Sequence, residues 1–168
     1  MPKIIENLQS RLMEEAKRQI LQSGYGALTI RSVASACGVG VGTVYNYFPS
    51  KDALVASFML EDWKGCMEQF CRTAEAAREP GPVIRSIYDQ LRIFSSRHQV
   101  IFLDEAAKND FAGSFTRYHS LLRSQLAQPI RKFCVDDFSA QFIAEALLTW
   151  TVAGKAFDEI YGVIGKLF

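Results

Sequence analysis

The chain has 168 residues, and its 49% hydrophobic content is sufficient for a packed core, which excludes global disorder. Its net charge is only +1, with six Lys and Arg against four acids in residues 1–52, so charge alone does not indicate a nucleic-acid binder. The four cysteines form no C-x-x-C pair and have no histidine at metal-ligand spacing, so we expect reduced thiols, no metal and no cofactor.

The first helix is predicted over residues 4–22. Its apolar residues recur at steps of three and four positions, as Ile5, Leu8, Leu12, Ala16 and Ile20. Ser23 and Gly24 end the pattern. This helix carries no site chemistry of its own, and we expect it to cover the short helices that follow, because two short helices cannot bury their apolar faces alone.

Residues 29–54, TIRSVASACGVGVGTVYNYFPSKDAL, predict a helix, a tight turn, a second helix and the start of a third. Thr29 is placed to cap a helix over residues 30–36, and Gly38 supplies the permissive backbone that a helix end requires. A second short helix is predicted over residues 42–47. Two short helices joined by such a turn are typical of the helix-turn-helix, whose second helix enters the DNA major groove.

The third helix of this stretch is predicted to begin at Lys51. Pro49 cannot continue the preceding helix, and Ser50 offers a new N-cap. Backbone N–H groups and Lys51 at this helix start would both attract a phosphate. Phe48 is interpreted as core packing, whereas core packing and DNA contact are equally open for Tyr45.

This stretch resembles the DNA-binding signature of the tetracycline-repressor (TetR) family. The matching pieces are Thr29-Ile30-Arg31, Ala34…Ala36-Cys37-Gly38-Val39, Gly42-Thr43-Val44-Tyr45, Tyr47-Phe48 and Ser50-Lys51. The resemblance spans residues 10–60. It implies an all-helical homodimer that binds an operator through its N-terminal helices and is released by a small ligand in its C-terminal domain. The DNA-binding residues are accordingly predicted to be Thr29, Arg31, Val41, Gly42, Thr43, Tyr45, Asn46, Tyr47 and Lys51.

Gly40 and Val41 depart from the family pattern, which often has Ser-Lys or a similar polar pair at these positions. Gly40 is a weaker N-cap than serine, and the side chain of Val41 cannot donate a hydrogen bond. Residues 40–44 are also poor intrinsic helix formers, so we expect the second helix to be poorly ordered without DNA. These departures keep open an alternative function, a dimeric helical interaction protein with weak or lost DNA binding.

The helix that begins at Lys51 is predicted to extend to residue 77, and four further helices are predicted over residues 83–96, 98–107, 113–132 and 138–161. A Pro-Gly-Pro break precedes the helix over residues 83–96, and Pro129 bends or ends the helix over residues 113–132. No β-alternation of any length occurs. The predicted fold class is therefore all-α: a three-helix helix-turn-helix DNA-binding domain in residues 1–50, and a helical ligand-binding and dimerisation domain in residues 51–168.

Aromatic side chains are spread over the C-terminal helices. Ordinary core packing is the favoured interpretation for each, although together with a few polar groups they also fit an apolar ligand cavity. The family resemblance implies a pocket for an unidentified small-molecule effector in this region. Its predicted lining residues are Trp63, Met67, Phe70, Tyr88, Phe94, Phe102, Phe115, His119 and Trp150.

The predicted helix over residues 138–161 is more apolar than one core face requires, with small residues beside Trp150 and Phe157. We interpret it as a surface for a second copy of the chain, joined with residues 115–130 in a four-helix bundle. Burial within one subunit is the alternative. The family has two full C-terminal helices here, and the chain stops at Phe168, so the final helix is expected to be short or missing.

Other functional classes find no support in the sequence. It contains no His-Glu-x-x-His, Glu-x-x-His, phosphate loop or nucleophile elbow, so we expect no enzymatic activity. Charged residues interrupt the first 14 positions, so we expect no secretory signal. The longest apolar run, residues 142–157, is too short to span a bilayer. The expected location is the cytoplasm. The expected partners are double-stranded DNA with a palindromic operator, a second copy of the chain and a small-molecule effector, with no membrane partner.

Overall fold

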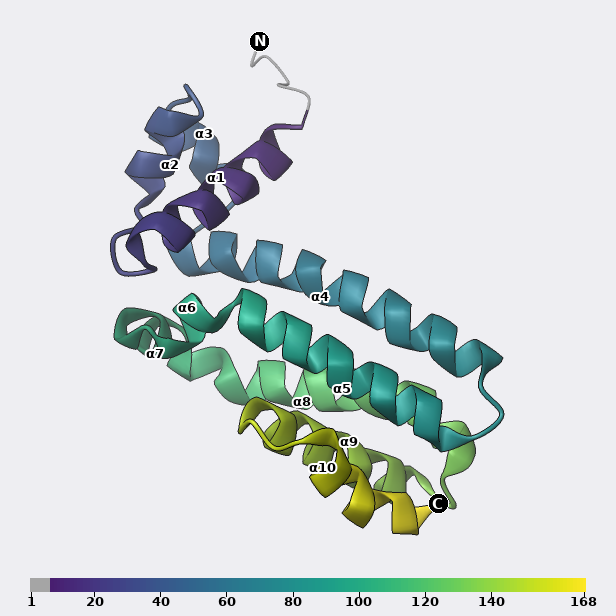
Figure 1. Cartoon of the computed structure of the whole chain (residues 1–168). Coiled ribbons are helices and arrows are strands. Elements are labelled where there is room, and N and C mark those ends of the chain that lie inside the picture. The colour runs from purple at the N-terminus through teal and green to yellow at the C-terminus, as the bar shows by residue number, and fades with distance from the viewer. Residues whose placement is uncertain (1–6) are drawn as a thin grey trace. The chain divides into compact units, whose positions relative to one another are not determined.

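The structure is a computed structural model that describes residues 7–168, apart from the side chain of Phe115 (Figure 1). All regular elements in this range are helices, which confirms the all-α prediction. The predicted beginning of the first helix, at residues 4–6, lies outside the described residues. The chain divides into two compact units: unit 1 comprises the residues up to Asp62 together with His98–Ala112, and unit 2 comprises Trp63–Arg97 and Gly113–Phe168.

Unit 1 combines helices from two separate parts of the chain. The first part supplies α1 (Leu8–Ser23), α2 (Ile30–Ala36), α3 (Val41–Tyr45) and the beginning of α4 (Lys51–Ala76). The second part supplies α6 (Gln99–Leu103) and α7 (Glu105–Phe111). The predicted helix over residues 98–107 is therefore two helices. Asp104 separates them because its backbone is extended and its carboxylate caps α7 by accepting from the N–H groups of Ala106 and Ala107.

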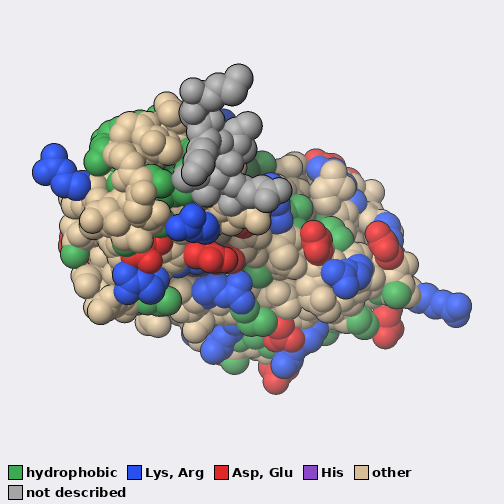
Figure 2. All heavy atoms as spheres, turned by 90° about the horizontal axis from the view of Figure 1, so that it is seen from above, with side chains coloured by type: hydrophobic (Ala, Val, Ile, Leu, Met, Phe, Trp, Pro, Cys, Tyr) green, Lys and Arg blue, Asp and Glu red, His purple; other side chains and the backbone are tan. Residues whose placement is uncertain are grey.

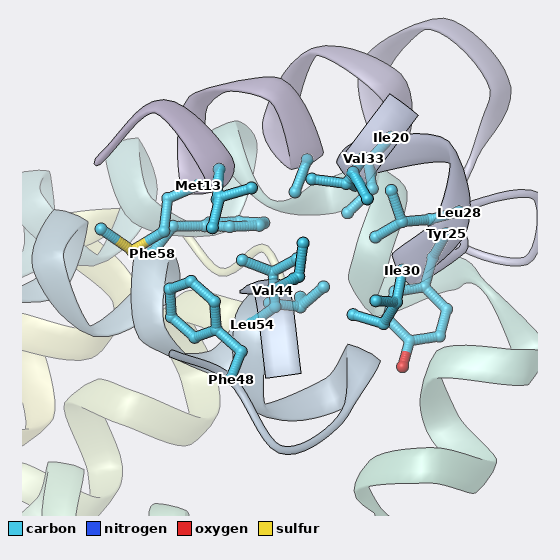
Figure 3. Packing of buried hydrophobic residues seen from close by; sticks show 14 of the residues in the cluster. Met13, Ile20, Tyr25, Leu28, Ile30, Val33, Val44, Phe48, Leu54 and Phe58 are labelled. Atoms are coloured by element: carbon cyan, nitrogen blue, oxygen red, sulfur yellow. The ribbon is translucent and has the colours of Figure 1, made fainter. Parts of the chain in front are cut away.

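One apolar core joins all six helices of unit 1. Figure 3 shows side chains of this core converging from α1, α2, α3, α4 and the loop before α2; those labelled are Met13, Ile20, Tyr25, Leu28, Ile30, Val33, Val44, Phe48, Leu54 and Phe58. Ile101 of α6 and Ala107 of α7 belong to the same cluster. Burial of this surface is the main stabilisation of α2, α3, α6 and α7, which are too short to persist alone.

Asp62, at the end of the α4 portion that belongs to unit 1, adds a polar junction to this core. One of its carboxylate oxygens accepts from the ammonium group of Lys17 at 3.0 Å, and the other lies 3.1 Å from Nε2 of His98. His98 is buried and stacks on Phe58, with ring centroids 6.1 Å apart. These contacts fasten α1 and the residue before α6 to α4 within unit 1.

Unit 2 is a helical bundle. Its elements are the remainder of α4, α5 (Pro80–Arg97), α8 (Phe115–Ala127), the 3₁₀-helix η2 (Gln128–Phe133), α9 (Asp137–Val152), α10 (Phe157–Ile164) and η3 (Gly165–Leu167). The short 3₁₀-helix η1 (Ala112–Ser114) precedes α8 and begins at the last residue of unit 1. Helix α9 packs against α5, α8 and α10. The predicted break at Pro129 is observed as the change from α8 to η2, and Pro80 opens α5 three residues before the predicted start.

The end of α4 lies within unit 2 and is stabilised by a lysine from η2. The Lys132 ammonium group donates to the backbone carbonyl of Ala74, and also to that of Ala77 at 3.0 Å. Carbonyl groups at a helix end have no partner inside the helix, and a cation there also interacts favourably with the negative end of the helix dipole. The predicted end of this helix at residue 77 is one residue from the observed end.

The prediction of one helix over residues 138–161 is wrong, because the chain leaves the helix after Val152. Gly154 has a φ of 84°, and Lys155 N–H donates to the carbonyl of Trp150 at 2.9 Å. This is the left-handed C-terminal motif that glycine favours. A new helix then begins, with the Glu159 carboxylate accepting from the Ala156 N–H at 3.0 Å. The final helix α10 is short, with eight residues.

Candidate nucleic-acid interface

Local capping fixes the start of α2. The Thr29 hydroxyl oxygen accepts from the backbone N–H of Ser32 at 3.0 Å, and the Ser32 hydroxyl oxygen accepts from the backbone N–H of Thr29 at 3.2 Å. This reciprocal arrangement satisfies two backbone donors and confirms Thr29 as the N-cap. The predicted bounds of this helix, residues 30–36, are also confirmed.

The turn between α2 and α3 is set by Gly38. Its φ of 69° lies in the left-handed region, and Val39 N–H donates to the carbonyl of Ala34 at 3.0 Å. The Arg11 guanidinium group from α1 donates to the Cys37 carbonyl at 3.3 Å. The turn therefore has a defined geometry, anchored to α1, and it determines the direction in which α3 leaves.

Helix α3 has five residues and begins at Val41, one residue before the predicted start, and ends at Tyr45, two before the predicted end. Gly40 caps it with extended backbone and no side-chain hydrogen bond. Val44 is fully buried, and Phe48 is only 2% exposed, which confirms the core interpretation of Phe48. These two side chains anchor the helix in unit 1 while its other faces meet solvent.

The residues predicted to bind DNA are all at least partly accessible in unit 1. Tyr45 is 51% exposed and Tyr47 is 40% exposed, large fractions for aromatic side chains. The other exposed members are Thr29, Arg31, Gly42 and Asn46, and the partly exposed members are Val41, Thr43 and Lys51. Their placement at the start of α2, on and after α3, and at the start of α4 is compatible with contact to one ligand surface. Their DNA-binding role is still a prediction.

Lys51 is engaged by two residues that the sequence analysis did not identify. Its ammonium group lies 4.1 Å from the centroid of the Tyr25 ring, 3.4 Å from the Tyr25 carbonyl oxygen and 3.9 Å from a carboxylate oxygen of Asp110. The Tyr25 hydroxyl donates to Asp110 at 2.7 Å. Asp110 comes 59 residues after Lys51, so no local sequence signal could have found this contact.

Figure 2 shows basic and acidic side chains interspersed on the face it presents, without a continuous basic stripe. This agrees with the small positive excess of residues 1–52. A nucleic-acid interface on this chain therefore depends on specific contacts from the helix-turn-helix more than on a long-range positive potential.

The short helix α3 gives a first testable prediction. A Cβ added at Gly42 meets no atom within 4 Å, so Gly42→Ala should stabilise unit 1 by about 0.5–1 kcal/mol through helix propensity. Gly38→Ala is the matched control, because its Cβ also meets no atom but its φ of 69° is strained for alanine. It should destabilise unit 1 by about 1 kcal/mol. Denaturant unfolding measures both, and a destabilising Gly42→Ala would contradict the helical assignment of this residue.

The predicted pocket residues fall into different environments. Trp63, Phe70 and Phe94 pack together in unit 2, with the Trp63 ring centroid 6.0 Å from Phe70 and 5.3 Å from Phe94. The Tyr88 hydroxyl donates to the Lys155 carbonyl at 3.0 Å. Met67 is partly buried near the middle of α4.

The remaining pocket candidates lie elsewhere. Phe102 belongs to unit 1, Trp150 is 51% exposed on α9, and His119 lies 3.4 Å from a carboxylate oxygen of Glu145. The side chain of Phe115 lies outside the part of the chain that the structure describes. A shallow hollow in unit 2, between the end of α4 and the start of α5, is lined by Thr73, Ala76, Ala77, Arg78, Glu79 and Pro82, none of them a predicted pocket residue. The pocket is still a prediction.

The described residues show no reactive thiol, metal site or membrane-spanning helix. None of the four cysteines forms a disulfide in the described structure. Burial raises the pKa of the Cys37, Cys71 and Cys134 thiols, which disfavours the reactive thiolate. Among residues 7–168, no cluster of three or more His, Cys, Asp or Glu side chains could hold a metal ion. No helix in the same range is both long and apolar enough to cross a membrane.

Comparison with known families and proteins gives consistent results. Residues 12–58 match the family described as bacterial regulatory proteins of the tetR family. The HTH-type transcriptional regulator UidR of Escherichia coli K12 is 22% identical over 161 residues, covering 94% of this chain and 80% of UidR. The HTH-type transcriptional repressor KstR of Rhodococcus jostii RHA1 is 34% identical over 67 residues, which cover 35% of this chain and 32% of KstR.

Two solved structures share the fold over almost the whole chain. Thermus thermophilus FadR, a TetR-family transcriptional repressor in complex with lauroyl-CoA, has a TM-score of 0.65 at 20% identity, covering 95% of this chain and 92% of FadR. SCO4454, a TetR-family transcriptional regulator from Streptomyces coelicolor, has a TM-score of 0.64 at 14% identity, with 95% coverage of both chains. The all-helical architecture, with its N-terminal helix-turn-helix, is therefore shared with these two proteins.

Proposed function

The chain is a transcriptional regulator of the TetR family, and we propose that it represses transcription as a homodimer on a palindromic operator, which it leaves when a small-molecule effector binds. The names of KstR and Thermus FadR, both repressors, support repression over activation. We assign DNA binding to residues 1–50, and effector binding and dimerisation to residues 51–168.

The exposed side chains around α3 carry this proposal. Val44 and Phe48 hold the segment in the core, which leaves Tyr45, Asn46 and Tyr47 exposed together. Amide, hydroxyl and aromatic groups of this kind bind base edges in the major groove and phosphates of the adjoining backbone. We assign Thr43, Tyr45 and Asn46 to bases or the adjoining backbone, and Thr29, Tyr47 and Lys51 to phosphates.

The homodimer is supported by the apolar surface of α9. Ile143, Ala144, Leu147 and Leu148 are buried on one side of the helix. On its exposed surface, Phe138 is 76% and Phe142 is 52% accessible, and their rings lie 6.4 Å apart. Exposed aromatic pairs on a helix favour a protein partner. A second copy, packing α8 and α9 into a four-helix bundle, would bury them and present two copies of α3 to successive major grooves.

The effector is proposed to act through α4. This helix is continuous from Lys51 to Ala76 and belongs to both units, so a rearrangement around its later turns can reach its first turn along one helix. Trp63, Phe70 and Phe94 place an aromatic cluster beside these later turns. Because Thermus FadR was solved with lauroyl-CoA, acyl-CoA thioesters are a reasonable first class of effector to test here.

The test is selection of bound duplexes from a random DNA library by the parent protein, in parallel with Lys51→Ala and Tyr47→Ala. We expect the parent to enrich a palindrome, and each variant to bind the selected duplex more weakly. Loss of the Lys51 phosphate contact should also make the fall of log affinity with log salt less steep, by about 0.9 in the slope. Absence of enrichment by a confirmed dimer at low salt would contradict the proposal and favour an interaction protein that has lost DNA binding.

A further inference from the structure

Asp110 lies beside the residue proposed to hold a DNA phosphate. Its carboxylate is 3.9 Å from the ammonium group of Lys51. The Tyr25 hydroxyl donates to the same carboxylate at 2.7 Å and thereby fixes its position. Burial, followed by this hydrogen bond, raises the pKa of Tyr25, so the tyrosine stays a donor. Lys51 therefore already has an anionic oxygen as a neighbour in the DNA-free structure.

Helix α7, which carries Asp110, is fixed to unit 1 at both ends. At its start, one Asp104 oxygen caps the helix while the other accepts from the Gly26 N–H at 3.2 Å. Burial acts to raise the pKa of Asp104, but hydrogen bonds from the N–H groups of Ala107, Gly26 and Ala106 outweigh it and lower that pKa. At its end, the Phe111 ring packs against the Tyr25 ring, with the two ring centroids 6.0 Å apart. Asp110 is thus held toward the start of α4 by several independent contacts.

We propose that Asp110 is an intrachain competitor of DNA phosphate for Lys51, so that α7 lowers the affinity of the protein for its operator. The inference rests on the proposed function, because it requires Lys51 to bind phosphate. A carboxylate and a phosphate present the same kind of anionic oxygen to an ammonium group. When DNA binds, the Asp110 carboxylate must either be displaced or remain as a negative charge close to the phosphate, and both lower affinity.

The position of α7 in the chain makes this contact adjustable. Residues 98–112 belong to unit 1, but the chain on both sides of this segment belongs to unit 2. A rearrangement of unit 2 can therefore pull on the segment through the backbone at either end. Movement of α7 away from Lys51 raises operator affinity, and movement toward Lys51 lowers it.

The experiment measures affinity for the selected duplex as a function of salt. Asp110→Asn keeps an acceptor for the Tyr25 hydroxyl and removes the charge, so operator binding should tighten roughly three- to tenfold at low salt. The matched control is Glu105→Gln, which makes the same charge change on the same helix at a residue that pairs with Lys108 at 2.7 Å instead of Lys51. It should change affinity less than about twofold.

Two further variants separate the local effect from other causes. In a Lys51→Ala background, Asp110→Asn should lose most of its effect, because the group for which it competes is absent. Asp110→Ala should tighten binding as Asp110→Asn does, since the charge and not the hydrogen bond is responsible. Thermal unfolding of each variant confirms that the protein is folded before affinity is compared.

The outcomes distinguish this inference from the proposed function. If the parent binds no duplex, the proposed function itself has failed. If the parent binds and Asp110→Asn leaves affinity unchanged, or if Glu105→Gln tightens binding equally, the competition is overturned while DNA binding stands. Weaker binding by Asp110→Asn would also overturn it, because Asp110 would then be positioning Lys51 for phosphate.

Discussion

Phe48→Ala is expected to destabilise unit 1 by about 3–5 kcal/mol and to abolish operator binding under conditions where the parent binds. Phe48 is almost fully buried in the core three residues after the end of α3, so its truncation leaves a cavity close to the point where α3 is anchored. Because typical domains are stable by only about 5–15 kcal/mol, a large share of the stability would be lost. Denaturant unfolding followed by circular dichroism measures the change.

Tyr47→Ala is the matched control for this substitution. Tyr47 is the adjacent residue and also aromatic, but it is partly exposed, and no hydrogen bond of its side chain is observed in the described structure. Its truncation should change stability by less than about 1 kcal/mol while weakening operator binding. Equal destabilisation by the two variants would show that Tyr47 is a packing residue, and its assignment to a phosphate would be wrong.

Trp63→Ala is expected to destabilise unit 2 by about 3–5 kcal/mol. Trp63 is 2% exposed, lies edge-to-face against Phe94, and its indole N–H donates to the Gln125 side-chain oxygen at 2.7 Å. The substitution removes a large apolar side chain and leaves a polar group of Gln125 without this partner. The fluorescence and circular dichroism transitions in denaturant would measure the loss.

Trp150→Ala makes the same chemical change at an exposed position in unit 2. It should alter the unfolding free energy of the subunit by less than about 0.5 kcal/mol, and any further loss should depend on protein concentration if α9 is the dimer surface. If Trp63→Ala proved as mild as Trp150→Ala, the Trp63 site would be a tolerant cavity, as expected of a ligand pocket, and not a close-packed core.

The helix-turn-helix was predictable because its signals are local. Thr29 caps α2 through residues three positions away, Gly38 sets the turn through its own φ, and Pro49 ends the preceding segment. Both ends of α2 could therefore be predicted from the sequence without error. The break between α9 and α10 also depends on a glycine, Gly154, but this glycine lies in a mostly apolar stretch that could be one continuous helix. An isolated glycine in an apolar run does not reveal from sequence whether its φ is positive.

The composition of unit 1 was not predictable in the same way. Placing α7 beside the start of α4 and the loop after α1 depends on contacts such as Asp110 with Lys51 and Asp104 with Gly26, which join residues far apart in the chain. Side-chain periodicity can place Ile101 on the buried face of a helix, but it does not show which core that face enters. The pocket residues were uncertain for a related reason, since aromatic side chains that line a cavity and those that fill a core have the same composition.

The insertion of residues 98–112 into unit 1 also bears on the order in which the chain folds during synthesis. The first 62 residues emerge from the ribosome well before Ile101 and Ala107, which complete their core. Until then the helix-turn-helix lacks part of its apolar cover and the anchors at Asp104 and Asp110. Contacts of such long sequence separation form slowly, because a long loop must close first. The core behind the helix-turn-helix is thus completed only after all of α5, a helix of unit 2, has been translated. Maturation of the N-terminal helices is therefore coupled to synthesis of later ones.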